Sequence, residues 1–168
     1  MDGVLVVVQF AHIAGGAAWL GGSLFANLVV LPYIARQPAE RQRGLVAGIV
    51  LGPEQIMIAA ALLAGLTGLA RGIVFGPITS LTALGSPYGL VWLGAIVAAA
   101  AVFAIGGGLT SPAARKLRDD DSIWRIEDPS AATERMAVMA RVRIGFRVEL
   151  AGIVLILALM AVLPFAGR

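Results

Sequence analysis

Cysteine is absent from this chain of 168 residues, and histidine occurs once, as His12. The absence of cysteine excludes disulfides, thiolate metal sites and thiol chemistry. A lone histidine cannot build a site of several imidazoles, and no serine, histidine and aspartate set for hydrolysis is recognisable around it. Charge is scarce as well: charged residues make up 14% of the chain, whereas an ordinary soluble domain has about 25%.

Apolar residues are abundant, at 59% of the chain, compared with about 45–50% in soluble domains. They gather in four runs, at about residues 4–34, 55–75, 88–109 and 144–165, each of the roughly 20 residues that a spanning helix needs. The runs are too long and too uninterrupted for the strands of a membrane barrel. The sequence therefore predicts an all-α integral membrane protein whose single domain, residues 1–168, is a four-helix bundle.

The basic residues are distributed unevenly over the segments that connect these runs. Arg36, Arg41 and Arg43 follow the first run, and eight more lie in the predicted loop 110–143 and its flank up to Arg147. Only Arg71 and Arg168 fall on the other side. The positive-inside rule then places both termini outside a bacterial-type inner (cytoplasmic) membrane. No nucleic-acid motif accompanies these charges, so no nucleic-acid partner is predicted.

The two ends of the chain carry further signals. No Lys or Arg precedes Arg36, so the first run is expected to be a retained membrane helix rather than a cleaved signal peptide. Asp128-Pro129 has the pattern of a helix start, and nothing interrupts the helix before about Leu163. Such a helix is about 50 Å long and exceeds the roughly 30 Å of hydrocarbon. We expect helix 4 to extend into the cytoplasm, either as a solvated or interfacial segment or as a docking surface for a partner.

One face of the first helix combines small residues with the single imidazole. Positions three and four apart share a face, and this face holds His12, Gly15, Gly16, Trp19, Gly22 and Ala26. Small residues let another backbone, or a flat group, come close. An ionisable side chain inside a span is by default a functional hypothesis. His12 is therefore either a metal or haem ligand or a packing residue that hydrogen-bonds to a neighbouring helix.

A single imidazole favours haem over a bare metal ion. Zinc needs three or four protein ligands, whereas haem iron needs only one or two axial ligands. We predict a haem b site on His12, with Gln9 orienting the imidazole and with Gly16 and Trp19 lining the pocket. Met160 lies at a similar depth from the outer surface and is the intrachain candidate for a second ligand. A second His12 from a homodimer and five-coordinate iron are the alternatives.

Two further features concern the cytoplasmic half of the bundle. Glu54 and Glu149 lie near the cytoplasmic ends of their spans, and Arg143 and Arg147 lie near Glu149 in sequence. They are expected to form an interfacial ion-pair cluster or to extend their side chains to the interface (snorkelling), or, alternatively, to form a polar mouth for a substrate or proton. The triple glycine 106–108 is expected to end or loosen the third helix.

The stretch "HIAGGAAWLGGSLFANLVVLP", from His12 to Pro32, resembles the first helix of the copper-resistance D (CopD) superfamily. It is also similar to that of the HemJ-type protoporphyrinogen oxidases. The residues that carry the resemblance are His12, Trp19, Gly21 and Pro32. The resemblance implies a helical bundle associated with haem b or copper, with His12 as the haem ligand.

Together these observations predict a membrane haem b-binding protein that acts in electron transfer, haem handling or redox or gas sensing. Its expected partners are the lipid bilayer, a second copy of the chain and a redox partner. If the chain is an enzyme, the expected class is a haem-dependent oxidoreductase. The alternative function is a small copper or solute transporter, with copper in place of haem and an oligomer forming the pore.

Overall fold

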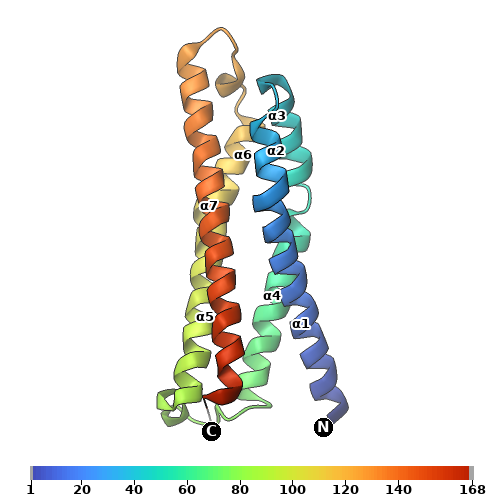
Figure 1. Ribbon diagram of the computed structural model, residues 1–168, viewed down its shortest axis with the longest axis vertical. Coiled ribbons are helices and arrows are strands. Elements are labelled where there is room, and N and C mark those ends of the chain that lie inside the picture. The colour runs from blue at the N-terminus through green and yellow to red at the C-terminus, as the bar shows by residue number, and fades with distance from the viewer. Residues whose placement is uncertain (1, 167–168) are drawn as a thin grey trace. The chain divides into compact units, whose positions relative to one another are not determined.

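The computed structural model describes residues 2–166, which are almost entirely helical and include no strand. Four segments are long and apolar enough to cross a membrane: Gly3–Ala35, Ala39–Ile73, Pro87–Asp119 and Pro129–Phe165. Figure 1 shows them as the long helices of the chain. The predicted all-α bundle with four long apolar helices is thus confirmed.

Each long segment is built from shorter elements. The first consists of α1 (Asp2–Phe25), a π-helical turn (Ala26–Val30) and α2 (Leu31–Ala35). The second consists of α3 (Ala39–Leu45), a π-helical turn (Val46–Val50) and α4 (Glu54–Ile73). The third consists of α5 (Pro87–Ile105), a π-helical turn (Gly106–Thr110) and α6 (Ser111–Asp119). The fourth is α7 (Pro129–Val162), which ends in a 3₁₀ turn (Leu163–Phe165). Two more 3₁₀ turns, Thr82–Gly85 and Asp121–Trp124, lie in the connections.

Each π-helical turn ends just before a proline, namely Pro32, Pro53 or Pro112. Proline has no N–H, and its ring clashes with the carbonyl four residues earlier, so a continuous α-helix cannot pass through it. Widening the preceding turn removes this conflict, and the helix continues at Pro32 and Pro112, whereas a short break at residues 51–53 separates the turn from α4. The triple glycine therefore loosens the third helix but does not end it, and the helix runs on to Asp119.

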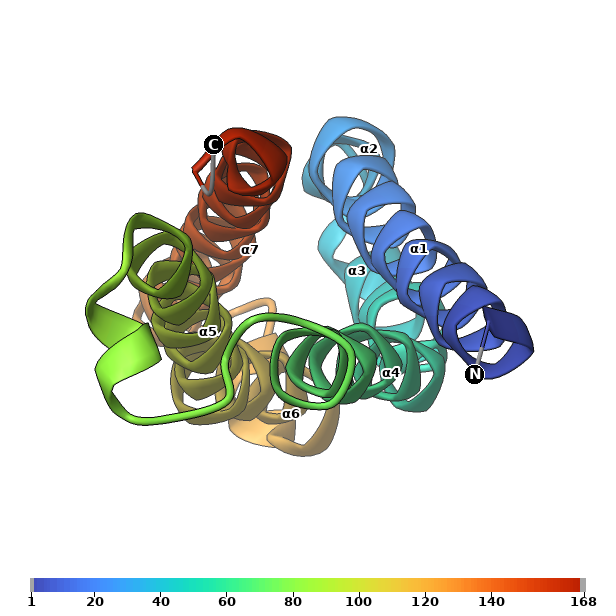
Figure 2. The same cartoon turned by 90° about the horizontal axis from the view of Figure 1, so that it is seen from below.

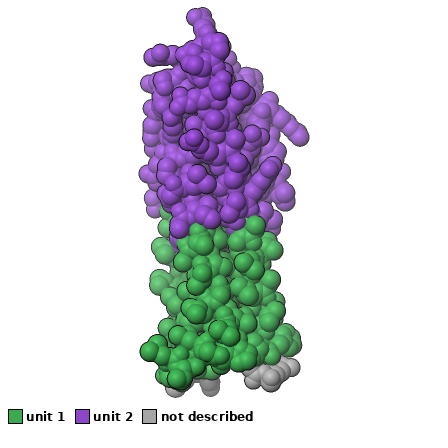
Figure 3. All heavy atoms as spheres, turned by 90° about the vertical axis from the view of Figure 1, so that its left-hand side faces the viewer, with its two compact units in different colours: residues 1–21, 57–102, 151–168 green, residues 22–56, 103–150 purple. Residues whose placement is uncertain are grey.

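The chain divides into two compact units, which Figure 3 colours separately. Unit 1 comprises residues 1–21, 57–102 and 151–168, and unit 2 comprises residues 22–56 and 103–150. In unit 1, Ile78, Trp92 and Leu163 form a buried apolar cluster. In Figure 2, α4 lies between α1 and α5, and α5 lies between α4 and α7.

Unit 2 has a larger apolar core, to which the predicted loop 110–143 contributes. Most of that loop is helical, as α6 and the first turns of α7. Leu117 and Val142 are fully buried, and Val138 and Met139 nearly so. The extension of helix 4 therefore packs one face into the unit 2 core, while its other face, with Glu134, Arg141 and Arg143, is exposed. Span prediction missed this because charged residues alternate here with the apolar ones.

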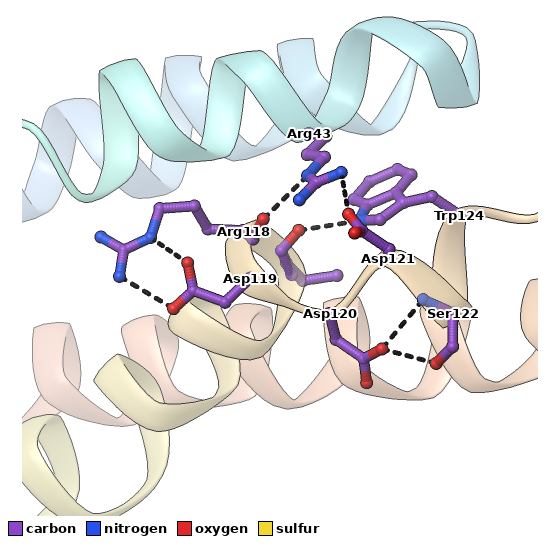
Figure 4. Close-up of polar contacts among 8 residues, drawn as sticks. Arg43, Arg118, Asp119, Asp120, Asp121, Ser122 and Trp124 are labelled. Atoms are coloured by element: carbon purple, nitrogen blue, oxygen red, sulfur yellow. Dashed lines mark hydrogen bonds and ion pairs between the residues drawn. The ribbon is translucent and has the colours of Figure 1, made fainter.

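Polar contacts fix the connection between α6 and α7 (Figure 4). The Trp124 indole N–H donates to the carbonyl of Leu117 over 2.8 Å, and Arg43 of α3 donates to the carbonyl of Arg118 over 2.8 Å. Ile123, in the 3₁₀ turn of this connection, is fully buried in the unit 2 core. The connection thus closes over the core instead of forming an open loop.

The carboxylates expected at the cytoplasmic ends behave differently from each other. Glu54 forms an ion pair with Arg115 at 3.1 Å. Glu149 accepts a hydrogen bond from the Thr110 hydroxyl and has no ion pair with any residue in the range 2–166. The expected pairing of Glu149 with Arg143 or Arg147 is therefore not formed, and both arginines are exposed.

Asp128 caps α7 as the sequence predicts, because its carboxylate accepts from the Ser130 backbone N–H at 2.8 Å. The hydrogen bonds from Ser130 also lower the pKa of Asp128. Because the folded-state pKa is the lower one, the cap stabilises α7 above the ordinary pKa of an aspartate and is lost as the pH falls through the folded-state value. We expect Asp128→Ala to speed amide hydrogen exchange in the first turn of α7 at neutral pH, and Asp128→Asn to leave it nearly unchanged. Equal exchange in all three proteins would contradict the capping role.

Candidate functional site

The site in unit 1 begins with the close approach of α1 to α4. A Cβ atom placed on Gly15 of α1 would lie 2.8 Å from the Ala60 carbonyl oxygen and 2.9 Å from the Ala64 backbone nitrogen. Both neighbours are backbone atoms of α4, so only glycine fits at this crossing. Ala60, Ala61 and Ala64 are buried there, as expected where small residues let two membrane helices touch.

This crossing brings His12, one turn before Gly15, against the backbone of α4. The imidazole Nδ1 lies 2.8 Å from the Ala64 carbonyl oxygen and 3.3 Å from the Thr67 hydroxyl. A carbonyl oxygen only accepts, so Nδ1 carries the proton and donates it to Ala64. Nε2 then holds the lone pair, and it has no hydrogen-bond partner within the part of the chain that the structure describes. Gly68 leaves room for the ring, since a Cβ at Gly68 would lie 3.1 Å from the His12 Cε1 atom.

The next helix, α5, packs on the same glycine face of α4 through Trp92. The indole N–H of this buried residue donates to the Gly68 carbonyl over 3.3 Å. A side chain at Gly72 would collide with the indole ring. The absence of a side chain at Gly68 thus admits the imidazole of His12, and its absence at Gly72 admits the indole of Trp92.

A cavity lies within unit 1, with walls from α1, α4, α5 and α7. Its volume is about 100 Å³, within a cleft whose empty volume, open space included, is about 800 Å³. The walls are nearly all apolar. The lining side chains that bear polar groups are those of His12, Trp19, Arg71, Tyr88 and Trp92.

Four of the predicted site residues meet on this cavity. His12, Gly16 and Trp19 line it from α1, and Met160 lines it from α7. Gln9 is half-buried one turn before His12 and is not part of the lining. The described partners of the imidazole are the Ala64 carbonyl and the Thr67 hydroxyl, not Gln9.

Residues that the sequence analysis did not assign to the site also line the cavity. Arg71 is the most informative of them. The sequence does indicate it as a candidate, because it is the only charged residue between Gln55 and Leu109. The Ala64 carbonyl gives no sequence signal, since every residue carries one. Among residues 2–166, no three His, Cys, Asp or Glu side chains come together, so the chain does not assemble the three or four protein ligands of a zinc-type site.

The fold and the site define a multi-pass helical bundle with one imidazole on the wall of an apolar cavity. Comparison with protein families, with curated proteins and with solved structures finds no match. The resemblance of residues 12–32 to the CopD and HemJ-type proteins therefore stays a prediction.

Proposed function

We propose that this chain is a membrane haem b-binding protein with His12 as an axial ligand, acting in electron transfer, haem handling or redox or gas sensing. One observation carries the proposal: the His12 Nδ1 donates to the Ala64 carbonyl, while Nε2 has no hydrogen-bond partner among residues 2–166 and the imidazole lines the cavity. Metal-ligating histidines in general donate their other N–H to a carbonyl or carboxylate, which fixes the tautomer and orients the ring. The hydrogen bond to α4 thus serves both packing and ligation.

The donor set fits haem better than a bare ion. Haem supplies four nitrogens to its iron, so the protein adds only axial ligands. Met160 lines the same cavity from α7 and is the second ligand that we propose. When bound, haem supplies one-electron chemistry or gas binding, and the axial ligands and the low polarity of the pocket tune it.

The size of the site sets a condition on this fit. Ligand pockets commonly measure about 300–1,000 Å³. The cavity of about 100 Å³ is smaller than this range, whereas the cleft of about 800 Å³ lies within it. Haem would therefore fill the cavity and extend into the open part of the cleft. In a bilayer that part of the porphyrin edge would contact lipid, which suits an apolar macrocycle.

The distribution of charge supports the proposed placement in the membrane. Unit 2 holds the arginines at positions 36, 41, 43, 115, 118, 125, 135, 141, 143 and 147. By the positive-inside rule this unit faces the cytoplasm of a bacterial-type inner membrane, and both termini lie outside. His12 lies in the N-terminal half of its span, so with that end outside, the haem site would lie in the outer half of the bilayer, where a redox partner on that side could reach it.

Titration of the detergent-purified protein with haemin tests the proposal. We expect wild-type protein to convert the broad absorption of free haemin into a sharp Soret band. His12→Ala should bind at least about 100-fold more weakly, because even the loss of a supporting partner costs 10–100-fold. His12→Gly should regain the band when free imidazole is added. Ile13→Ala is the matched control, since the neighbouring Ile13 is 57% exposed and should bind as wild type does.

Two results would refute the proposal. One is wild-type protein that leaves the haemin spectrum unchanged. The other is a Soret band of equal strength in wild-type and His12→Ala protein. Copper-dependent uptake into liposomes, together with either result, would favour the transporter in its place.

A further inference from the structure

Arg71 gives the cavity a single cationic group. It lies in the last turn of α4 and is half-buried, and it is the only Lys or Arg among the lining residues. Thr67 and Gly68, which contact the imidazole, precede it by four and three residues. Residues at these spacings share a helix face. The Arg71 side chain therefore leaves α4 about one turn, or about 5.4 Å along the helix axis, beyond the residues that contact the imidazole.

This cation has no anionic partner within the described chain. Among residues 2–166 no ion pair includes Arg71, and the sequence of unit 1 contains one acidic side chain, that of Asp2. A guanidinium in an apolar wall is costly unless an anion or several acceptors satisfy it. Its planar fork of N–H donors matches a carboxylate in a bidentate arrangement.

We propose that Arg71 binds the acidic group of the ligand that occupies the cavity. This inference rests on the proposed function, and for haem b the acidic groups are the two propionate carboxylates. The ligand would then be held at two points on different helices, through its metal by His12 of α1 and through its carboxylate by Arg71 of α4. Tyr88 also lines the cavity, and its hydroxyl would be a second donor to that carboxylate. The site thus selects an amphipathic ligand, apolar in its body and acidic at one end.

The experiment compares two probes, haemin and haemin dimethyl ester, in which both carboxylates are esterified. Affinities are measured by Soret titration for wild type, Arg71→Gln and Arg71→Lys. We expect wild type to bind the ester about 10- to 100-fold more weakly than haemin, as for the loss of a charge-assisted hydrogen bond. Arg71→Gln should weaken haemin by a similar factor and change the affinity for the ester less than about threefold. Arg71→Lys should recover part of the haemin affinity.

The ester also reports on folding, because its unchanged affinity requires an intact cavity. If Arg71→Gln lowers the affinities for haemin and for the ester equally, or lowers neither affinity, the inference is overturned while haem binding stands. If wild type binds neither probe, the proposed function itself fails. If Arg71→Gln yields no folded protein, the decision rests on wild type and Arg71→Lys: a ratio of ester to haemin affinity equal to one in wild type overturns the inference, and a ratio that shifts toward one in Arg71→Lys supports it.

Discussion

Replacing Gly15 by valine is expected to force α1 away from α4 and to abolish haemin binding. The valine Cβ would start 2.8 Å from the Ala60 carbonyl oxygen and 2.9 Å from the Ala64 nitrogen. Neither atom can rotate aside, because both belong to the backbone of α4. The movement must therefore separate the helices, which breaks the hydrogen bond from His12 to the Ala64 carbonyl and leaves the imidazole free to turn.

We expect this substitution to cost about 3 kcal/mol of stability, the upper end of the usual overpacking range, measured as thermal unfolding in detergent by circular dichroism. Gly21→Ala is the matched control on the same helix, because a Cβ at Gly21 meets nothing within 4 Å. It should leave both stability and haemin binding intact. If Gly15→Val unfolded at the wild-type temperature, the close crossing of α1 and α4 would be refuted, whatever the protein binds.

The number and type of the helices were predictable because hydropathy runs report them directly. The start of α7 was predictable too, since Asp128-Pro129 combines a capping carboxylate with a residue suited to the first turn. The extents of the first and fourth helices also match the prediction, whereas the second and third helices are longer than predicted. Pro32 and Pro112 normally mark helix ends, but here a π-helical turn before each lets the helix continue. Whether a helix ends at a proline or continues through a widened turn depends on the elements that pack against the residues beyond it. A single sequence does not show which elements those are.

The candidate site was partly predictable, for reasons that differ between residues. The spacing of His12, Gly16 and Trp19 defines one helix face, and depth in the membrane linked Met160 to that face. The structure brings all four to one cavity, while their role in binding a cofactor stays a prediction. The orientation of the imidazole was assigned to Gln9 on the same helix, whereas the partner is a backbone carbonyl of α4. Periodicity describes one helix at a time and contains no information on which neighbour supplies such a group.

Removing the Thr110 hydroxyl is expected to destabilise the protein strongly, because of Glu149. Thr110 is 4% exposed and donates to the Glu149 carboxylate, which has no ion pair among residues 2–166. Gly106 lies close by, since a Cβ there would be 3.6 Å from Glu149 Oε1. Thr110→Val keeps the side-chain shape but leaves the carboxylate without its donor. Such a loss costs about 1–3 kcal/mol, and more for charged groups.

Three variants isolate this contact when their thermal unfolding is measured in detergent. Thr110→Ser should stay near wild type, because the hydroxyl remains. Thr110→Val should lose about 2 kcal/mol or more, and Thr110→Val combined with Glu149→Leu should recover much of that loss, since an apolar pair leaves no polar group unsatisfied. If Thr110→Val and Thr110→Ser were equally stable, the hydroxyl would contribute nothing and Glu149 would have to be satisfied by water. Recovery in the double variant would show that the penalty arises from the carboxylate itself and not from a change in packing at Thr110.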